Sequence, residues 1–147
     1  MAKGNIITWA LLGIVALLAA PSLIGLVRGP AETPGVFEAG YSLQEATQKS
    51  ASTGKPMLVL VTADWCPPCQ ALKRGALQDE RVAAWINSNT VPVYLEDGAD
   101  RDAIASLPVT SFPTTLLIDD GAVVGSVVGN ASASSYLDAL TGAVSGS

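Results

Sequence analysis

An apolar run that ends at two closely spaced cysteines, PMLVLVTADWCPPC, sets the first limits on how this chain folds. Residues 56–63 are largely apolar and partly β-branched, which is typical of a strand covered by helices on both faces of a sheet. We expect a helix to start at once, with Cys66 as its N-cap and Pro67 and Pro68 in its first two positions, where their missing N–H groups cost little. The run therefore predicts a buried strand that leads into a helix, with the cysteine pair at the junction.

The chain after residue 40 predicts alternating helices and strands. One helix begins after Ser42, which forms an S-x-x-E capping box with Glu45, and another follows Asp79, a favourable N-cap. Further helices are expected over 70–78, from a cap at Asp100 to Ser106, and over 132–141, and further strands over 90–96, 114–119 and 122–128. An Asp-Gly pair between the last two strands indicates a hairpin. This order predicts the α/β class, with a mixed sheet and helices on both faces.

The N-terminal part contains an uncharged apolar run over residues 6–27, IITWALLGIVALLAAPSLIGLV. Its length is about that of a helix that crosses a bilayer, roughly 20 residues. A cleaved signal peptide is the alternative, but its apolar core would be shorter, and here Pro21 follows the small pair Ala19-Ala20, which makes a poor cleavage site. We therefore expect an anchor over residues 1–28, with secretion as the outcome if the segment is cleaved.

The flanks of this run suggest an orientation and a boundary. Lys3 and the amino terminus outnumber Arg28 by one positive charge, which favours the N-terminus on the cytoplasmic side and the rest of the chain in the periplasm or outside the cell. Residues 29–40, GPAETPGVFEAG, hold two prolines and three glycines, a composition that suits a linker. A domain is then expected over 41–147.

The charged residues exclude several classes of function. The net charge is −5 and there is no histidine, so the chain lacks the basic footprint of a nucleic-acid-binding protein and the imidazole of Ser-His or Cys-His catalysis. Lys73 and Arg74 are interpreted as a solvated helix face. Two cysteines without histidine also fall short of the four ligands of a structural zinc site, so no metal is expected.

The cysteine pair itself favours redox chemistry. A purely structural disulfide would close a very short loop and remove little entropy from the unfolded chain. The partial positive charge at a helix N-terminus instead favours a thiolate at Cys66, and Cys69 lies one turn further in. We therefore predict that Cys66 attacks a partner disulfide and that Cys69 resolves the mixed disulfide, with Trp65 beside the exposed sulfur. The pair carries the electrons, so no bound cofactor is expected.

These residues resemble the thioredoxin superfamily over about residues 42–140. LVLVTADWCPPC matches the family's strand followed by W-C-x-x-C, and SFPTTLLID is similar to its second signature, a proline before the third strand. The resemblance implies a thioredoxin fold in which Pro113 is cis and lies opposite the cysteines. It also implies that Phe112 offers its backbone to an extended substrate. VVGNASASSYLDAL resembles the last strand and closing helix, which would place Gly129 near the substrate groove.

Within the superfamily, the ADWC entry and the D-x-x-V step are most similar to the C-terminal domain of the transmembrane reductase DsbD and related tethered thioredoxins. Two positions depart from thioredoxin: Leu60 replaces a buried aspartate, and Val93 replaces a lysine on the next strand. Asp64 and Glu96 are candidates to replace the missing proton acceptor for Cys69. The redox potential stays open, because Pro67, Pro68 and Asp64 all bear on the stability of the thiolate.

The sequence thus predicts a membrane-tethered thiol–disulfide oxidoreductase of thioredoxin fold that acts on protein thiols outside the cytoplasm, with reduction favoured over oxidation by the resemblance. Its reduced state must be restored by a redox partner that the sequence does not identify. Two alternatives remain open: a tethered module that binds peptides or acts as a chaperone without turnover, and a thiol-based metal chaperone, for example for Cu(I).

Overall fold

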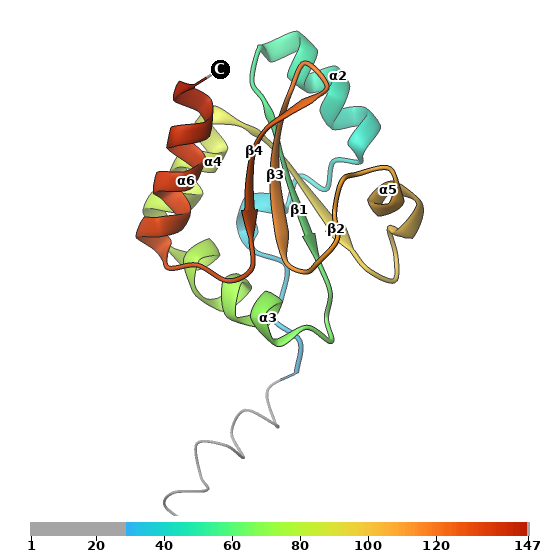
Figure 1. Cartoon of the computed structure of the whole chain (residues 1–147), viewed down its shortest axis with the longest axis vertical. Helices are drawn as coiled ribbons and strands as arrows, with labels where there is room; N and C mark the ends of the chain where they lie inside the picture. The colour runs from blue at the N-terminus through green and yellow to red at the C-terminus, as the bar shows by residue number, and fades with distance from the viewer. Residues whose placement is uncertain (1–28, 147) are drawn as a thin grey trace, which may run out of the picture. The chain divides into compact units, whose positions relative to one another are not determined.

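The computed structural model describes residues 29–146, and the chain divides into two units at Pro30. All the helices and strands described below belong to the second unit, which begins at Ala31 (Figure 1). The expected anchor over residues 1–28 lies outside the described residues. Within residues 29–146, every helix is too short or too polar to span a bilayer.

A four-stranded mixed sheet forms the centre of this unit (Figure 1). Its strands are β1 (Met57–Thr62), β2 (Val91–Glu96), β3 (Thr114–Asp119) and β4 (Ala122–Val128), in the spatial order β2-β1-β3-β4. β1 runs parallel to β2 and antiparallel to β3, and β3 pairs antiparallel with β4. The mixed sheet predicted from the sequence is confirmed. Pro92 lies on an edge strand, where a missing N–H is tolerated.

Helices cover both faces of the sheet, as expected. They are α2 (Leu43–Thr53), α3 (Pro67–Arg74), α4 (Glu80–Asn89), α5 (Arg101–Ala105) and α6 (Ala133–Ser145), with short 3-10 helices η1 (Gly35–Phe37) and η2 (Ala76–Gln78). α3, α4 and α6 lie on one side of the sheet, and α2 and α5 lie on the other (Figure 1). The sequence suggested one helix over 70–78, but α3 ends at Arg74. Gly75 follows, where a Cβ would come within 2.9 Å of the carbonyl oxygen of Ala71.

Side-chain caps set most of the helix starts. Ser42 and Glu45 form the predicted capping box, and Asp79 caps α4 by accepting the backbone N–H of Arg81. Asp100 precedes α5 but is not a side-chain cap, which corrects the sequence-based expectation. Its carboxylate instead accepts the backbone N–H of Glu96 at 2.8 Å, because this short turn follows directly on the end of β2.

The β3–β4 connection confirms the predicted hairpin. Asp120 and Gly121 both have positive φ, 46° and 79°, the conformation that a two-residue type I′ turn requires. Glycine adopts this conformation without strain, and aspartate tolerates it better than most residues.

The core has two layers because β1 is buried on both faces. Leu58 and Leu60 face the cluster beneath α3, α4 and α6, whereas Val59 and Val61 face the cluster beneath α2. Every residue of β1 is buried, as the apolar run predicted. β1 therefore ends inside the fold and delivers the cysteine motif to the edge of the core.

Part of the segment expected to be a linker is packed. Gly35–Phe37 forms η1, and Val36 and Phe37 are buried in the cluster on the α3 side of the sheet. The ring of Phe37 lies 5.7 Å from that of Tyr94, between centroids. The proline and glycine content indicated the turns correctly, but burial of two adjacent apolar side chains fixes this part of residues 29–40 onto the domain.

Candidate redox active site

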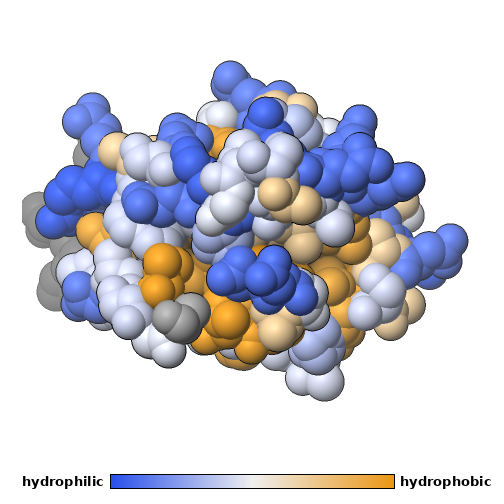
Figure 2. Space-filling view, turned by 90° about the horizontal axis from the view of Figure 1, so that it is seen from above, coloured by the Kyte–Doolittle hydropathy of each residue, from blue (hydrophilic) through white to orange (hydrophobic). Residues whose placement is uncertain are grey.

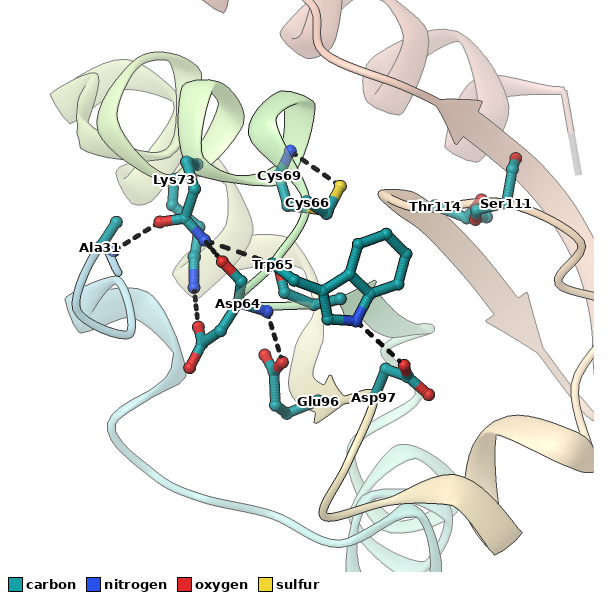
Figure 3. Close-up of a disulfide and its surroundings, with 12 residues drawn as sticks. Ala31, Asp64, Trp65, Cys66, Cys69, Lys73, Glu96, Asp97, Ser111 and Thr114 are labelled. Carbon is teal, nitrogen blue, oxygen red and sulfur yellow. Dashed lines mark hydrogen bonds and ion pairs between the residues drawn. A yellow bond between two sulfur atoms is a disulfide. The ribbon is translucent and has the colours of Figure 1, made fainter. Parts of the chain in front are cut away.

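The two cysteines form a disulfide at the start of α3 (Figure 3). Their Cα atoms are 5.3 Å apart. Cys66 is the N-cap, its Sγ accepts the backbone N–H of Cys69 at 3.3 Å, and Pro67 and Pro68 begin the helix as predicted. In this oxidised form both cysteines are buried, Cys66 at 3% exposure and Cys69 at 0%. The small remaining exposure belongs to Cys66, the predicted nucleophile.

Aromatic side chains border the disulfide. Phe112 packs against Cys66 and Cys69, and its ring meets the indole of Trp65 at a centroid distance of 5.9 Å. Trp65 is 70% exposed, and its Nε1 donates to Oδ2 of Asp97 at 3.3 Å (Figure 3). Trp65 is therefore on the surface next to the cysteines and is not part of the core. Its role in substrate binding stays a prediction.

Pro113 and Gly129 meet where β3 begins and β4 ends. The Phe112–Pro113 peptide bond is cis, as the resemblance implied, and the backbone N–H of Gly129 donates to the carbonyl oxygen of Pro113 at 2.8 Å. Gly129 has a φ of 85°, which disfavours any side chain at this position. The substrate-binding roles of these residues also stay predictions.

Two large hydrophobic side chains of β4 are exposed, one at each end of the strand. Val128 is 65% exposed beside Gly129, and Val123 is 45% exposed near the β3–β4 turn. Figure 2 views the unit from this second end, opposite the cysteines. Hydrophilic residues cover much of that view, and hydrophobic residues gather in a smaller area in its lower half.

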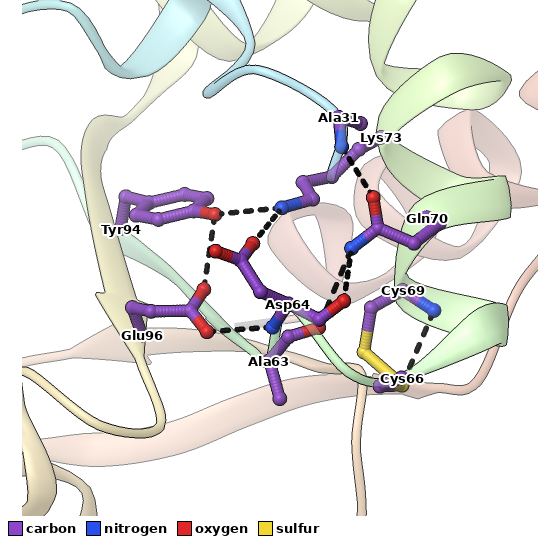
Figure 4. Close-up of polar contacts among 9 residues, drawn as sticks. All are labelled: Ala31, Ala63, Asp64, Cys66, Cys69, Gln70, Lys73, Tyr94 and Glu96. Atoms are coloured by element: carbon purple, nitrogen blue, oxygen red, sulfur yellow. Dashed lines mark hydrogen bonds and ion pairs between the residues drawn. A yellow bond between two sulfur atoms is a disulfide. The ribbon is translucent and has the colours of Figure 1, made fainter. Parts of the chain in front are cut away.

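Lys73 is buried, which corrects its interpretation as part of a solvated helix face. Its side chain is 1% exposed, and its Nζ lies 3.1 Å from Oδ1 of Asp64 and 3.1 Å from the hydroxyl of Tyr94 (Figure 4). Cys69, Leu72 and Lys73 are all buried on one side of α3. The helical spacing of three and four residues from Cys69 carries Lys73 to the inside.

Asp64 and Glu96, the candidates for the missing proton acceptor, take part in the same network. Glu96 accepts the backbone N–H of Asp64 at 2.7 Å, and the hydroxyl of Tyr94 donates to its other oxygen at 3.3 Å. Gln70 donates to the carbonyl oxygen of Asp64 at 3.1 Å and accepts the N–H of Ala31 (Figure 4). Both carboxylates therefore brace the loop that precedes Cys66.

Val93, the position that the resemblance matched to the lysine of thioredoxin, is not the residue beside Leu60 on the next strand; that residue is Tyr94. Leu60 and Tyr94 are register partners in the parallel β1–β2 pair, and both belong to the cluster on the α3 side. Val93 faces the opposite cluster, because neighbouring residues of a strand alternate between faces. Here the buried lysine near the active site comes from helix α3 and not from the strand.

The contacts of this network set its charge states. Burial alone would lower the pKa of Lys73, but the hydrogen bonds that its ammonium donates to Tyr94 and Asp64 outweigh burial and raise that pKa above its ordinary value. Burial has the opposite effect on Tyr94, because it disfavours the phenolate and so raises the pKa of this residue. At neutral pH Lys73 is thus an ammonium that donates to the Tyr94 hydroxyl, which in turn donates to Glu96.

Comparison with known proteins decides the family. The profile described as thioredoxin-like domain matches residues 43–143, more than half of the chain. The chain belongs to the thioredoxin-like family. The Cys66–Cys69 disulfide lies within the matched residues.

Several known proteins are similar to parts of the chain. A probable chloroplastic 5′-adenylylsulfate reductase of Oryza sativa subsp. japonica is 34% identical over 98 residues, 61% of this chain. The match spans only 21% of that relative, about a fifth of its length.

Solved structures share the fold. The DsbH oxidoreductase has a TM-score of 0.64 and 20% identity, over 72% of this chain and 83% of its own. A thioredoxin from Thermus thermophilus has a TM-score of 0.61 and 21% identity, over 69% and 83%. Trxlp from Edwardsiella tarda has a TM-score of 0.56 and 27% identity, over 67% and 93%.

Proposed function

We propose that this protein is a membrane-anchored protein-disulfide reductase that acts outside the cytoplasm. The position of Cys66 carries the chemistry, because it caps α3 and its Sγ accepts the backbone N–H of Cys69. The partial positive charge of a helix N-terminus stabilises a thiolate there. Cys66 is then the nucleophile, and the fully buried Cys69 is the resolving thiol.

The reaction is a thiol–disulfide exchange in two steps. The Cys66 thiolate attacks one sulfur of a substrate disulfide, which forms a mixed disulfide and releases the other substrate sulfur as a thiolate. The thiolate of Cys69 then attacks Sγ of Cys66, releases the second substrate sulfur and closes the Cys66–Cys69 disulfide. Two electrons and two protons pass to the substrate. A dithiol of another protein restores the pair by the same exchange in reverse.

The surface beside the cysteines suits an extended segment of a protein substrate. Trp65 offers an exposed aromatic face, and Phe112 lies next to the disulfide. The backbone of Phe112, before cis-Pro113, would pair with the substrate chain as a strand does. Gly129 leaves open space where a side chain would otherwise stand, since a Cβ there would meet no atom within 4 Å.

The direction and the location rest on the sequence. The ADWC entry is similar to that of tethered reductases, which favours transfer of electrons to the substrate. The uncharged run over residues 6–27 supports an anchor, and the charges at its ends favour a redox domain outside the cytoplasm.

Trapping of a mixed disulfide tests the oxidoreductase reaction. The full-length Cys69→Ser variant, incubated with insulin as a disulfide-bonded protein, should form a covalent adduct through Cys66 that dithiothreitol releases. Cys66→Ser is the matched control and should form none. A Cys69→Ser protein that holds unfolded peptides reversibly without any adduct would instead be a binding module. Stoichiometric copper after expression would indicate a metal chaperone.

A further inference from the structure

We infer that Lys73 is a positioning residue of the redox site, which holds Asp64 in place and offsets the negative charge that surrounds the loop before Cys66. This inference rests on the proposed oxidoreductase function and adds a determinant of its redox potential. The role is distinct from that of the cysteines, because Lys73 acts through Asp64 and through its charge.

The burial of Lys73 is the first observation. An ammonium at 1% exposure loses nearly all its hydration, which is unfavourable unless hydrogen bonds and an opposite charge replace the water. Two partners do so here, the carboxylate of Asp64 and the hydroxyl of Tyr94, each at 3.1 Å. Figure 4 shows the ammonium between these two groups. Lys73 is therefore held in one position.

The loop that Lys73 contacts is braced from several sides. Gln70 donates to the carbonyl oxygens of Ala63 and Asp64, at 3.5 Å and 3.1 Å. Glu96 accepts the N–H of Asp64 at 2.7 Å. The indole N–H of Trp65, the next residue along the loop, donates a hydrogen bond to the carboxylate of Asp97. The chain enters the cysteine turn directly after these contacts, so the network fixes the approach to Cys66.

The charges of this network are unbalanced. Asp64, Glu96 and Asp97 are three carboxylates that contact the loop, whereas two cations lie against them: Lys73 is 3.1 Å from Asp64, and the exposed Arg101 is 4.0 Å from Asp97. A thiolate at Cys66 adds a further negative charge in the reduced protein. Lys73 lies on the same helix as both cysteines, and long side chains of a helix point back toward its N-terminus. Its charge therefore favours the thiolate, whereas the carboxylates oppose it.

This balance predicts opposite effects for the two members of the ion pair. Lys73→Met keeps the length and the apolar packing of the side chain but removes the charge, so the Cys66 thiolate loses a stabilising cation. Asp64→Asn keeps the shape of the side chain and removes an opposing anion. A role confined to folding would instead move both variants in the same direction.

The test measures the redox equilibrium of the full-length variants with dithiothreitol, reading the cysteine state by alkylation. Lys73→Met should shift the equilibrium toward the disulfide by about threefold or more, which is a fall of about 14 mV in reduction potential at 29.6 mV per tenfold. The pH profile of Cys66 alkylation should move to higher pH. Asp64→Asn should shift the equilibrium about twofold toward the dithiol and the profile to lower pH.

Lys49→Met is the control, since Lys49 is an exposed lysine on α2 and should leave both readouts at the wild-type values. Equal potentials for wild type and Lys73→Met, or shifts of the same sign in both members of the pair, would overturn the inference. If Lys73→Met does not fold, the Asp64→Asn result tests the inference alone. The Asp64 side chain is 55% exposed, so this substitution should leave the fold intact. Failure of the proposed function would differ, because the wild-type pair would then exchange with no protein disulfide at all.

Discussion

The indole of Trp65 meets the ring of Phe112 edge to face, with centroids 5.9 Å apart and ring planes at 75°. This pair joins the loop before Cys66 to the residue before cis-Pro113, so it spans the two segments that border the disulfide. Trp65→Ala should raise the KM for a protein disulfide about tenfold, because an exposed aromatic anchor beside the reacting sulfur is lost. The free energy of unfolding should change by less than about 1 kcal/mol.

Trp85→Ala is the matched control for this prediction. Trp85 is only partly buried and packs on the cluster beneath α3, α4 and α6. Its removal should lower the free energy of unfolding by roughly 1–3 kcal/mol and leave the KM unchanged. Steady-state reduction and urea unfolding measure the two effects. An unchanged KM in Trp65→Ala would place substrate binding elsewhere.

A buried hydroxyl pair ties α6 to the sheet. The hydroxyl of Tyr136 lies 2.7 Å from Oγ1 of Thr115, both residues are buried, and burial raises the pKa of Tyr136, so it stays neutral. Tyr136→Phe should cost about 1–3 kcal/mol, because it leaves the Thr115 hydroxyl without this partner in the core. In the double variant with Thr115→Val, the loss should be smaller than the sum of the two single losses. Strict additivity in urea unfolding would contradict the bond.

Thr62, in contrast to Thr115, has a buried hydroxyl without a hydrogen-bond partner among the described residues. This hydroxyl lies at the end of β1. Thr62→Val replaces the hydroxyl with a methyl group of similar size and should raise the free energy of unfolding by about 1 kcal/mol. A loss of stability in urea unfolding would reveal a partner for this hydroxyl.

The capping box of α2 predicts a dependence of stability on pH. The hydrogen bonds from the side chain and backbone of Ser42 lower the pKa of Glu45 below its ordinary value of 4.5. A carboxyl with a lower pKa in the folded state stabilises the fold above its unfolded pKa, and this contribution disappears as the pH falls through the folded pKa. Glu45→Gln should therefore be less stable than wild type near pH 7, and the difference should shrink below about pH 4.

Urea unfolding across this pH range measures the effect. In a Ser42→Ala background, which removes the hydroxyl that bonds Glu45, the same Glu45→Gln change should have a smaller pH dependence. An equal dependence in both backgrounds would assign the effect to another group.

Local signals in the sequence predicted most of the fold and the position of the cysteine pair at the start of a helix. The run at 56–63 predicted a strand buried on both faces, and β1 is one. The prolines between the cysteines predicted a helix that starts at Cys66, because proline at a first helical position loses no hydrogen bond. The Asp-Gly pair predicted the hairpin through its preference for positive φ. In each case the physical cause lies within a few residues.

The features that the sequence analysis missed depend on contacts between distant segments. Lys73 is buried because Asp64 and Tyr94 approach it from other elements, although its spacing of four from Cys69 was a usable signal for the inner face. Leu60 pairs with Tyr94 and not with Val93, and the register of a parallel pair cannot be read from either strand alone. Val36 and Phe37 bury against residues far along the chain, in a segment whose composition suggested only a linker.

The reduction potential of the Cys66–Cys69 pair tests the central claim most directly. The full-length protein would be equilibrated in dithiothreitol or glutathione buffers of known potential, and the cysteine state read by alkylation and mass. We predict a value near that of thioredoxin, about −270 mV, as a disulfide reductase requires. A value near that of DsbA, about −120 mV, would contradict the proposed direction and make the protein an oxidant of its partners.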